Sequence, residues 1–140
     1  MDTPPAAKNG GNMSYYFATK VDVPFDEAVE KAKEALKKEG FGVLTDIDVT
    51  ATLKAKLGVD FRPYRILGAC HPQSAYAALQ AEGNIGLMLP CNVVVREAGP
   101  GNVSVSAIDP IASMAAVENE GLAEVAAEVR RKLKAVIDSL

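Results

Sequence analysis

The residues of this chain that are best suited to chemistry are two cysteines and one histidine, and all three lie in one stretch. Cys70 and His71 follow an apolar run that begins at Tyr64, and Cys91 comes directly after Pro90. Two thiols that lie close together could bind a soft metal or a haem iron, or could form a reversible disulfide. The sequence therefore gives a candidate thiol site, but it identifies no reaction and no cofactor.

The two cysteines have two interpretations. Cys70 lies just before a helix that Pro72 opens, and backbone N–H groups at a helix N-terminus lower the pKa of a thiol. On adjacent strands the two sulfur atoms could approach each other. The spacing of the cysteines, however, matches no standard zinc or thioredoxin pattern. Because each cysteine shares its strand face with apolar residues, both could instead be inert core thiols, a common environment for free cysteine.

Four other polar residues are candidates for a site. His71 could act as a base or a ligand beside Cys70, or it could be a solvent-exposed N-cap residue. Asp46 and Asp48 share one strand face and could bind a hard cation or act as acid and base. Alternatively, Asp48 caps the next helix and Asp46 is a surface or salt-bridged group. Asn92 interrupts an apolar strand, so we expect a buried amide that binds a neighbouring loop or a ligand.

Composition excludes several classes of protein. With 140 residues, 49% hydrophobic and 24% charged, the chain is expected to form one soluble domain. It has no apolar run long enough for a membrane span and no secretory signal, so we expect a cytoplasmic protein with reduced thiols. The net charge of −3 argues against nucleic acid as a partner.

The elements that must position these residues alternate between strand and helix over the first two-thirds of the chain. Residues 1–13 are expected to be a disordered tail, and residues 14–140 a single domain. We predict strands over 15–21, 41–48, 64–70, 86–97 and 103–108. Helices are predicted to begin near Pro24, Thr50, Pro72 and Leu122, with a short one over 111–117. This order predicts an α+β fold with a single mixed or antiparallel sheet of about five strands and helices mainly on one face.

Two further features of the sheet are predicted. Pro90 cannot donate a ladder hydrogen bond, so we expect a bulge or a sheet edge there. The sheet face without helices is expected to be too apolar to be freely solvated, which suggests a dimer surface or a ligand cavity. The residues expected on that face are Tyr16, Leu67, Met88, Val94 and Ile108.

Four segments of the chain resemble the domain of unknown function 302 (DUF302) family. They are Gly40-Phe41-Gly42-Val43, Asp46-Ile47-Asp48, Leu67-Gly68-Ala69-Cys70 with Pro72, and Gly86-Leu87-Met88-Leu89-Pro90-Cys91-Asn92-Val93-Val94-Val95. The resemblance covers residues 14–140. It implies a small α+β domain that is usually homodimeric, and it implies no established activity. Family members commonly have Asn at the position of His71, which favours the N-cap interpretation, whereas both thiols match the pattern.

These observations favour a dimeric binding domain with a pocket for a small apolar or soft ligand near Cys70 and Cys91. The alternative is a thiol-based redox or metal-handling protein that uses the same two cysteines. A third hypothesis is a hydrolase-like enzyme that uses Asp46, Asp48 and His71.

Overall fold

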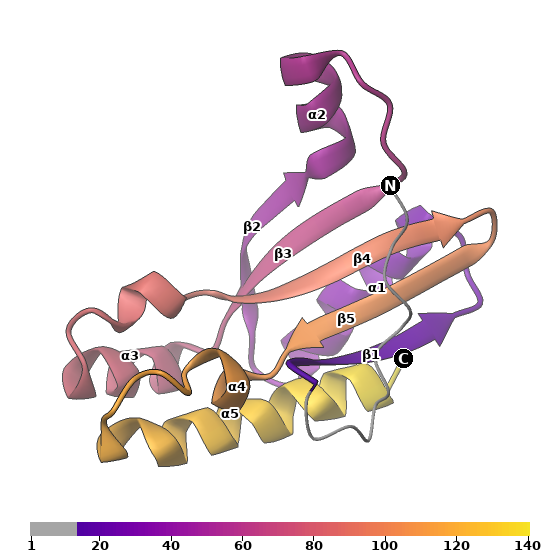
Figure 1. The fold of residues 1–140 in the computed structure, drawn as a ribbon. Helices are drawn as coiled ribbons and strands as arrows, with labels where there is room; N and C mark the ends of the chain where they lie inside the picture. The colour runs from indigo at the N-terminus through magenta and orange to yellow at the C-terminus, as the bar shows by residue number, and fades with distance from the viewer. Residues whose placement is uncertain (1–13) are drawn as a thin grey trace.

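The computed structural model describes residues 14–140, which form one five-stranded sheet with helices packed on it (Figure 1). The predicted tail, residues 1–13, lies outside the described residues. The strand order is β1-β5-β4-β3-β2, and every neighbouring pair is antiparallel. The predicted α+β fold with a single sheet is thus confirmed. The strands are β1 (Tyr16–Val21), β2 (Gly42–Asp48), β3 (Tyr64–Cys70), β4 (Cys91–Gly99) and β5 (Asn102–Ile108).

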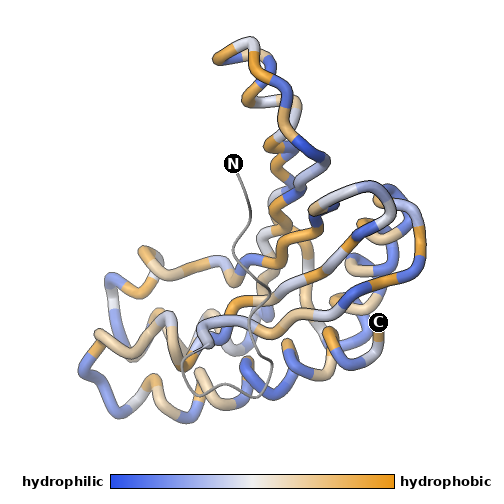
Figure 2. The backbone as a smooth tube through the Cα atoms, turned by 45° about the vertical axis from the view of Figure 1, so that its right-hand side comes forward, coloured by the Kyte–Doolittle hydropathy of each residue, from blue (hydrophilic) through white to orange (hydrophobic). Residues whose placement is uncertain are grey.

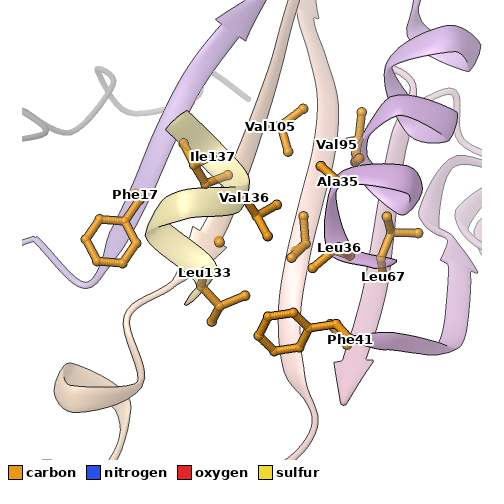
Figure 3. Close-up of a cluster of buried hydrophobic side chains, with 14 of the residues drawn as sticks. Phe17, Ala35, Leu36, Phe41, Leu67, Val95, Val105, Leu133, Val136 and Ile137 are labelled. Atoms are coloured by element: carbon orange, nitrogen blue, oxygen red, sulfur yellow. The ribbon is translucent and has the colours of Figure 1, made fainter. Parts of the chain in front are cut away.

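Two long helices, α1 (Phe25–Lys38) and α5 (Glu120–Asp138), cover one face of the sheet. Each presents one apolar stripe, and these stripes bury against the inward-facing valines of the central strands. Figure 3 shows the centre of this main core, where Leu36, Leu133 and Val136 lie over the sheet. Within residues 14–140, no helix combines the length and apolarity needed to cross a membrane.

Three shorter elements extend past one end of the sheet (Figure 1). They are α3 (Pro72–Ala81), the 3₁₀ helix η1 (Ile85–Met88) and α4 (Pro110–Ser113). Helix α3 packs against α5. Buried side chains from α3, η1, the end of α4 and the first half of α5 form a second apolar cluster: Ala78, Ile85, Met114, Leu122 and Ala126.

Strand β4 begins later than predicted. We expected a strand over 86–97, but residues 85–88 form η1 and β4 begins at Cys91. Pro90 has no N–H to donate, so it precedes the ladder and is not a bulge within it. The observed register shifts lie elsewhere, in β2 between Val43 and Thr45 and at the end of β4 between Glu97 and Gly99.

The shift in β2 makes Leu44 an extra residue and changes which face of the sheet each later side chain of β2 occupies. Val43 pairs with Ala69 and Ile47 pairs with Ile66, so the two lie on opposite faces. Regular alternation along β2, without the extra residue, would instead have placed Val43 and Ile47 on one face.

The sheet face opposite α1 and α5 carries only some of the predicted apolar residues. Tyr16, Val94 and Ile108 lie there and are half-buried. Leu67 was predicted on this face but is fully buried in the main core. Met88 was predicted there too, but it belongs to η1 and not to the sheet. Ile66, which pairs with both Val94 and Ile47, lies on this face as well, so the face is still partly apolar.

Helix α2 (Val49–Leu57) stands away from the rest of the molecule, between β2 and β3 (Figure 1). Asp48 is its N-cap, because a carboxylate oxygen accepts a hydrogen bond from the N–H of Ala51 at 2.9 Å. Gly58 ends the helix with a φ of 69°, a left-handed conformation that favours glycine. The predicted helix and its predicted cap are both confirmed.

Candidate functional site

A cavity of about 330 Å³ lies where the ends of β3 and β4 meet helices α3 and α5. It separates the main core from the second apolar cluster. Both cysteines, His71 and the bulged Leu44 line it. The other lining residues are Phe41, Ala69, Ser74, Ala75, Ala78, Leu79, Gly86, Leu89, Pro90, Pro110, Met114, Val125, Ala126 and Val129.

Small side chains on the two facing helices leave this space open. Ala75 and Ala78 come from α3, and Ala126 comes from α5. Where two packed helices present alanines to each other, no side chain is long enough to fill the gap beyond the end of the sheet. The hollow is therefore a consequence of residue size at three helical positions.

The lining of the cavity is almost entirely apolar. Only His71, Ser74 and the two cysteines bring polar side-chain atoms to it. An apolar lining with a few polar groups is typical of small-molecule sites, because a polar ligand group without a hydrogen-bond partner is costly to bury.

Cys91 is a buried, neutral thiol. Its side chain is on the same rung as Ala69, facing the main core, and the residue is 7% exposed. Burial, and secondarily the nearby Cys70, raises the pKa of Cys91 to about 11. Near neutral pH the sulfur therefore stays protonated.

Cys70 is half-buried at the end of β3, one residue beyond the rung that Cys91 shares with Ala69. Both cysteines are free thiols, with no disulfide between them. The structure thus brings the two predicted site cysteines to one cavity, Cys91 within it and Cys70 in a more accessible position.

His71 is the N-cap residue of α3, as predicted, but its side chain does not cap the helix. The imidazole packs edge-on against Phe41, with ring centroids 5.5 Å apart, and its Nδ1 lies 2.9 Å from Oγ of Ser74. A Cβ at Gly40, which has a φ of 87°, would lie 3.2 Å from Nε2 of His71. Phe41, Ser74 and Gly40 surround the ring, and His71 is half-buried. The prediction of a solvent-exposed cap residue is therefore wrong.

Asp46 is part of an ion cluster and is not among the residues that line the cavity. Its two oxygens accept hydrogen bonds from Nε and Nη2 of Arg65, both at 2.7 Å, and Nζ of Lys33 lies 2.9 Å away. The Arg65 guanidinium holds the pKa of this carboxyl well below its usual range. Since Asp48 is committed to capping α2, neither carboxylate is placed beside His71 as the hydrolase hypothesis requires.

Asn92 does not reach the cavity. It pairs with Gly68, lies on the sheet face opposite α1 and α5, and is exposed. The predicted buried amide is therefore wrong, because β4 alternates from Cys91 and so directs Asn92 outward.

Most of the cavity wall was missed by sequence reasoning. Ala78, Met114 and Ala126 line it, yet in the sequence they cannot be distinguished from ordinary core residues. Within residues 14–140, no three His, Cys, Asp or Glu side chains are grouped so that they could hold a metal ion. A metal at this site would have to rely on the two thiols with fewer protein ligands than is usual.

Comparison with known proteins places the chain among relatives without a described activity. The model of the family described as "Domain of unknown function DUF302" matches residues 17–140. A solved structure from Bacillus stearothermophilus, described as an uncharacterized conserved protein DUF302, is similar with a TM-score of 0.81 and 34% identity. The match covers 89% of this chain and 96% of that one. No curated protein matches.

Proposed function

The chain belongs to the DUF302 family, and we propose that it is a homodimeric protein that binds a small apolar ligand in the cavity beside Cys70 and Cys91. The observation that carries this proposal is an apolar cavity of about 330 Å³ in a domain that is otherwise well packed. Leu44 and Leu79 in its wall are 66% and 46% exposed, so it is an apolar cleft that opens to solvent, the usual form of a small-molecule site.

The volume of the cavity limits the size of the ligand. A dry apolar cavity of about 150 Å³ holds one benzene molecule, and the cavity here is roughly twice that size. We infer a ligand of about ten to fifteen non-hydrogen atoms, equivalent to two fused rings or a short branched chain. Any polar group it has would lie near Ser74 and His71, where the lining offers hydrogen-bond partners.

The two cysteines contribute contacts to this ligand in the proposed function. The thiolate is the nucleophilic form of cysteine, and the raised pKa of Cys91 keeps that thiol protonated. A neutral thiol behaves as a small, polarisable apolar group, which suits a soft or aromatic ligand. This favours binding over a redox mechanism in which Cys91 is the attacking sulfur. A reducing cytoplasm would keep both thiols free.

The dimer is supported by apolar side chains that the single chain leaves in water. Leu57, Val59 and Phe61 are 69%, 44% and 37% exposed, and they lie close together in the sequence. Several exposed apolar side chains gathered in one segment are typical of a protein–protein interface. Sedimentation analysis at micromolar concentration should give the mass of two chains, and a monomer would contradict this part of the proposal.

Titration with naphthalene tests the cavity. The expected result is saturable shifts of amide NMR signals from the residues around Ala78 and Ala126, which line the cavity. Ala78→Leu places a large side chain in the cavity and should abolish these shifts. Ala77→Leu makes the same change on the exposed side of α3 and should leave them unchanged. A folded wild-type protein that shows no shifts at saturating naphthalene would contradict the proposed function.

A further inference from the structure

The segment from Ile47 to Phe61, here called the α2 arm, contains helix α2 although none of its residues is buried. Figure 1 shows α2 projecting from the end of β2 and β3, away from the other helices. A helix of nine residues is too short to be stable in water by itself, because most helical stability in proteins comes from packing of an apolar face. A partner surface that packs on α2 would therefore stabilise it.

The arm presents an apolar stripe to solvent. Val49, Leu53 and Leu57 recur every four residues, so they lie on one side of α2. Leu57 is 69% exposed, and the neighbouring Val59 and Phe61 extend the apolar surface. Figure 2 shows hydrophobic positions, in orange, recurring along the arm between hydrophilic ones. Val49 and Leu53 are half-buried, so the exposed part of the stripe is its C-terminal end, and an exposed apolar surface of this kind is typical of an interface.

The charges at the two ends of α2 indicate which partner fits. The N-terminal end carries the acidic Asp48 and the C-terminal end carries Lys54 and Lys56. Lys54 is paired with Asp60 at 3.0 Å, whereas Lys56 has no ion pair within residues 14–140. A helix with this polarity is complementary to an antiparallel copy of itself, because opposite charges and opposite ends of the helix dipoles then meet.

We propose that α2 packs against α2 of a second copy of this chain, antiparallel and about a two-fold axis near Leu53. In this arrangement Val49 faces Leu57 of the partner subunit, and Asp48 lies beside Lys56 of the partner subunit. The approach is unobstructed because β2, which leads into the arm, is an edge strand of the sheet. This inference rests on the proposed dimer and names the surface that forms it.

Leu57→Lys tests the arm. Since Leu57 is already 69% exposed, the substitution removes no buried contact of a single chain, so the variant should stay folded. It should raise the dimer dissociation constant at least tenfold, measured by sedimentation equilibrium. Leu87→Lys is the matched control, because Leu87 is 86% exposed on η1, and it should leave the dimer intact.

Cross-linking tests the two-fold axis independently. In a Cys70→Ala background, where the remaining Cys91 is buried, Leu53→Cys should form a disulfide-linked dimer under mild oxidation. Ala55→Cys lies on the other side of α2 and should form none. Equal cross-linking of the two variants would overturn the arrangement.

The outcomes separate this inference from the proposed function. A wild-type dimer that Leu57→Lys does not weaken would overturn the α2 interface and leave the proposed dimer standing. A wild-type monomer would overturn both. Naphthalene binding is measured separately, so neither result decides whether the cavity binds a ligand.

Discussion

Gly68 of β3 lies against the ring of Pro90: a Cβ placed on Gly68 would be 2.8 Å from Cγ of that proline and closer still to Oγ1 of Thr45. Pro90 lines the cavity and directly precedes β4. The glycine therefore allows the segment before Cys91 to pack onto the sheet. Its role is steric and needs no special backbone conformation.

Gly68→Ala should destabilise the protein by about 1–3 kcal/mol, because neither the proline ring nor the branched threonine can easily move aside. Chemical denaturation of wild type and variant measures the difference. Gly42→Ala is the matched control in the neighbouring strand, since a Cβ there would meet nothing within 4 Å. Equal losses for the two variants would show that the close packing at Gly68 is unimportant.

The buried thiol of Cys91 should make stability depend on alkaline pH. Its pKa is raised from 9.0 to about 11, so the folded state holds the proton more tightly than the unfolded state. The resulting stability is complete below pH 9 and is lost as the pH rises towards 11, by about 2–3 kcal/mol. Denaturation curves measured over this range should show a steeper decline for wild type than for Cys91→Ala. Cys70→Ala should keep the wild-type slope, and a Cys91→Ala slope equal to wild type would contradict the assignment.

The same alanine-to-leucine change should have different effects at two buried sites. Ala78 lines the cavity, so Ala78→Leu has room and should leave stability unchanged or raise it by about 0.5–2 kcal/mol. Ala32 lies fully buried in the main core, so Ala32→Leu should cost about 1–3 kcal/mol. Thermal unfolding of both variants measures this contrast. A large loss in Ala78→Leu would mean that the cavity cannot accept a side chain.

The ion cluster around Asp46 should make stability depend on acidic pH. Because the pKa of Asp46 is lowered by Arg65 and Lys33, its contribution is present above the ordinary value of 3.8 and is lost as the pH falls below it. Asp46→Asn should therefore cost about 1 kcal/mol at neutral pH, and the difference from wild type should shrink below pH 4. Asp60→Asn removes a carboxylate that is 93% exposed and should change stability less. No loss in Asp46→Asn would contradict a stabilising cluster.

Local sequence signals predicted most of the individual elements. Pro72 marked the first turn of α3, and Asp48 and Gly58 marked the two ends of α2. These signals act between residues that are near in sequence, so one chain is enough to read them. The position of β4 was predicted less well, because an apolar run without alternation fits a strand and a short helix equally.

The chain by itself indicated an α+β architecture with a single mixed or antiparallel sheet, and it placed Cys70 at a strand end and Cys91 on the next strand along the chain. Only the tertiary structure decided that both thiols line one cavity, that Asp46 is committed to Arg65, and that Asn92 points outward. The physical reason is that hydrophobic periodicity sets which residues face inward, whereas an empty space depends on how closely two helices can approach. The distance between α3 and α5 is set by the alanines that the two helices present to each other. These alanines are about 50 residues apart in the chain, and they meet only after folding.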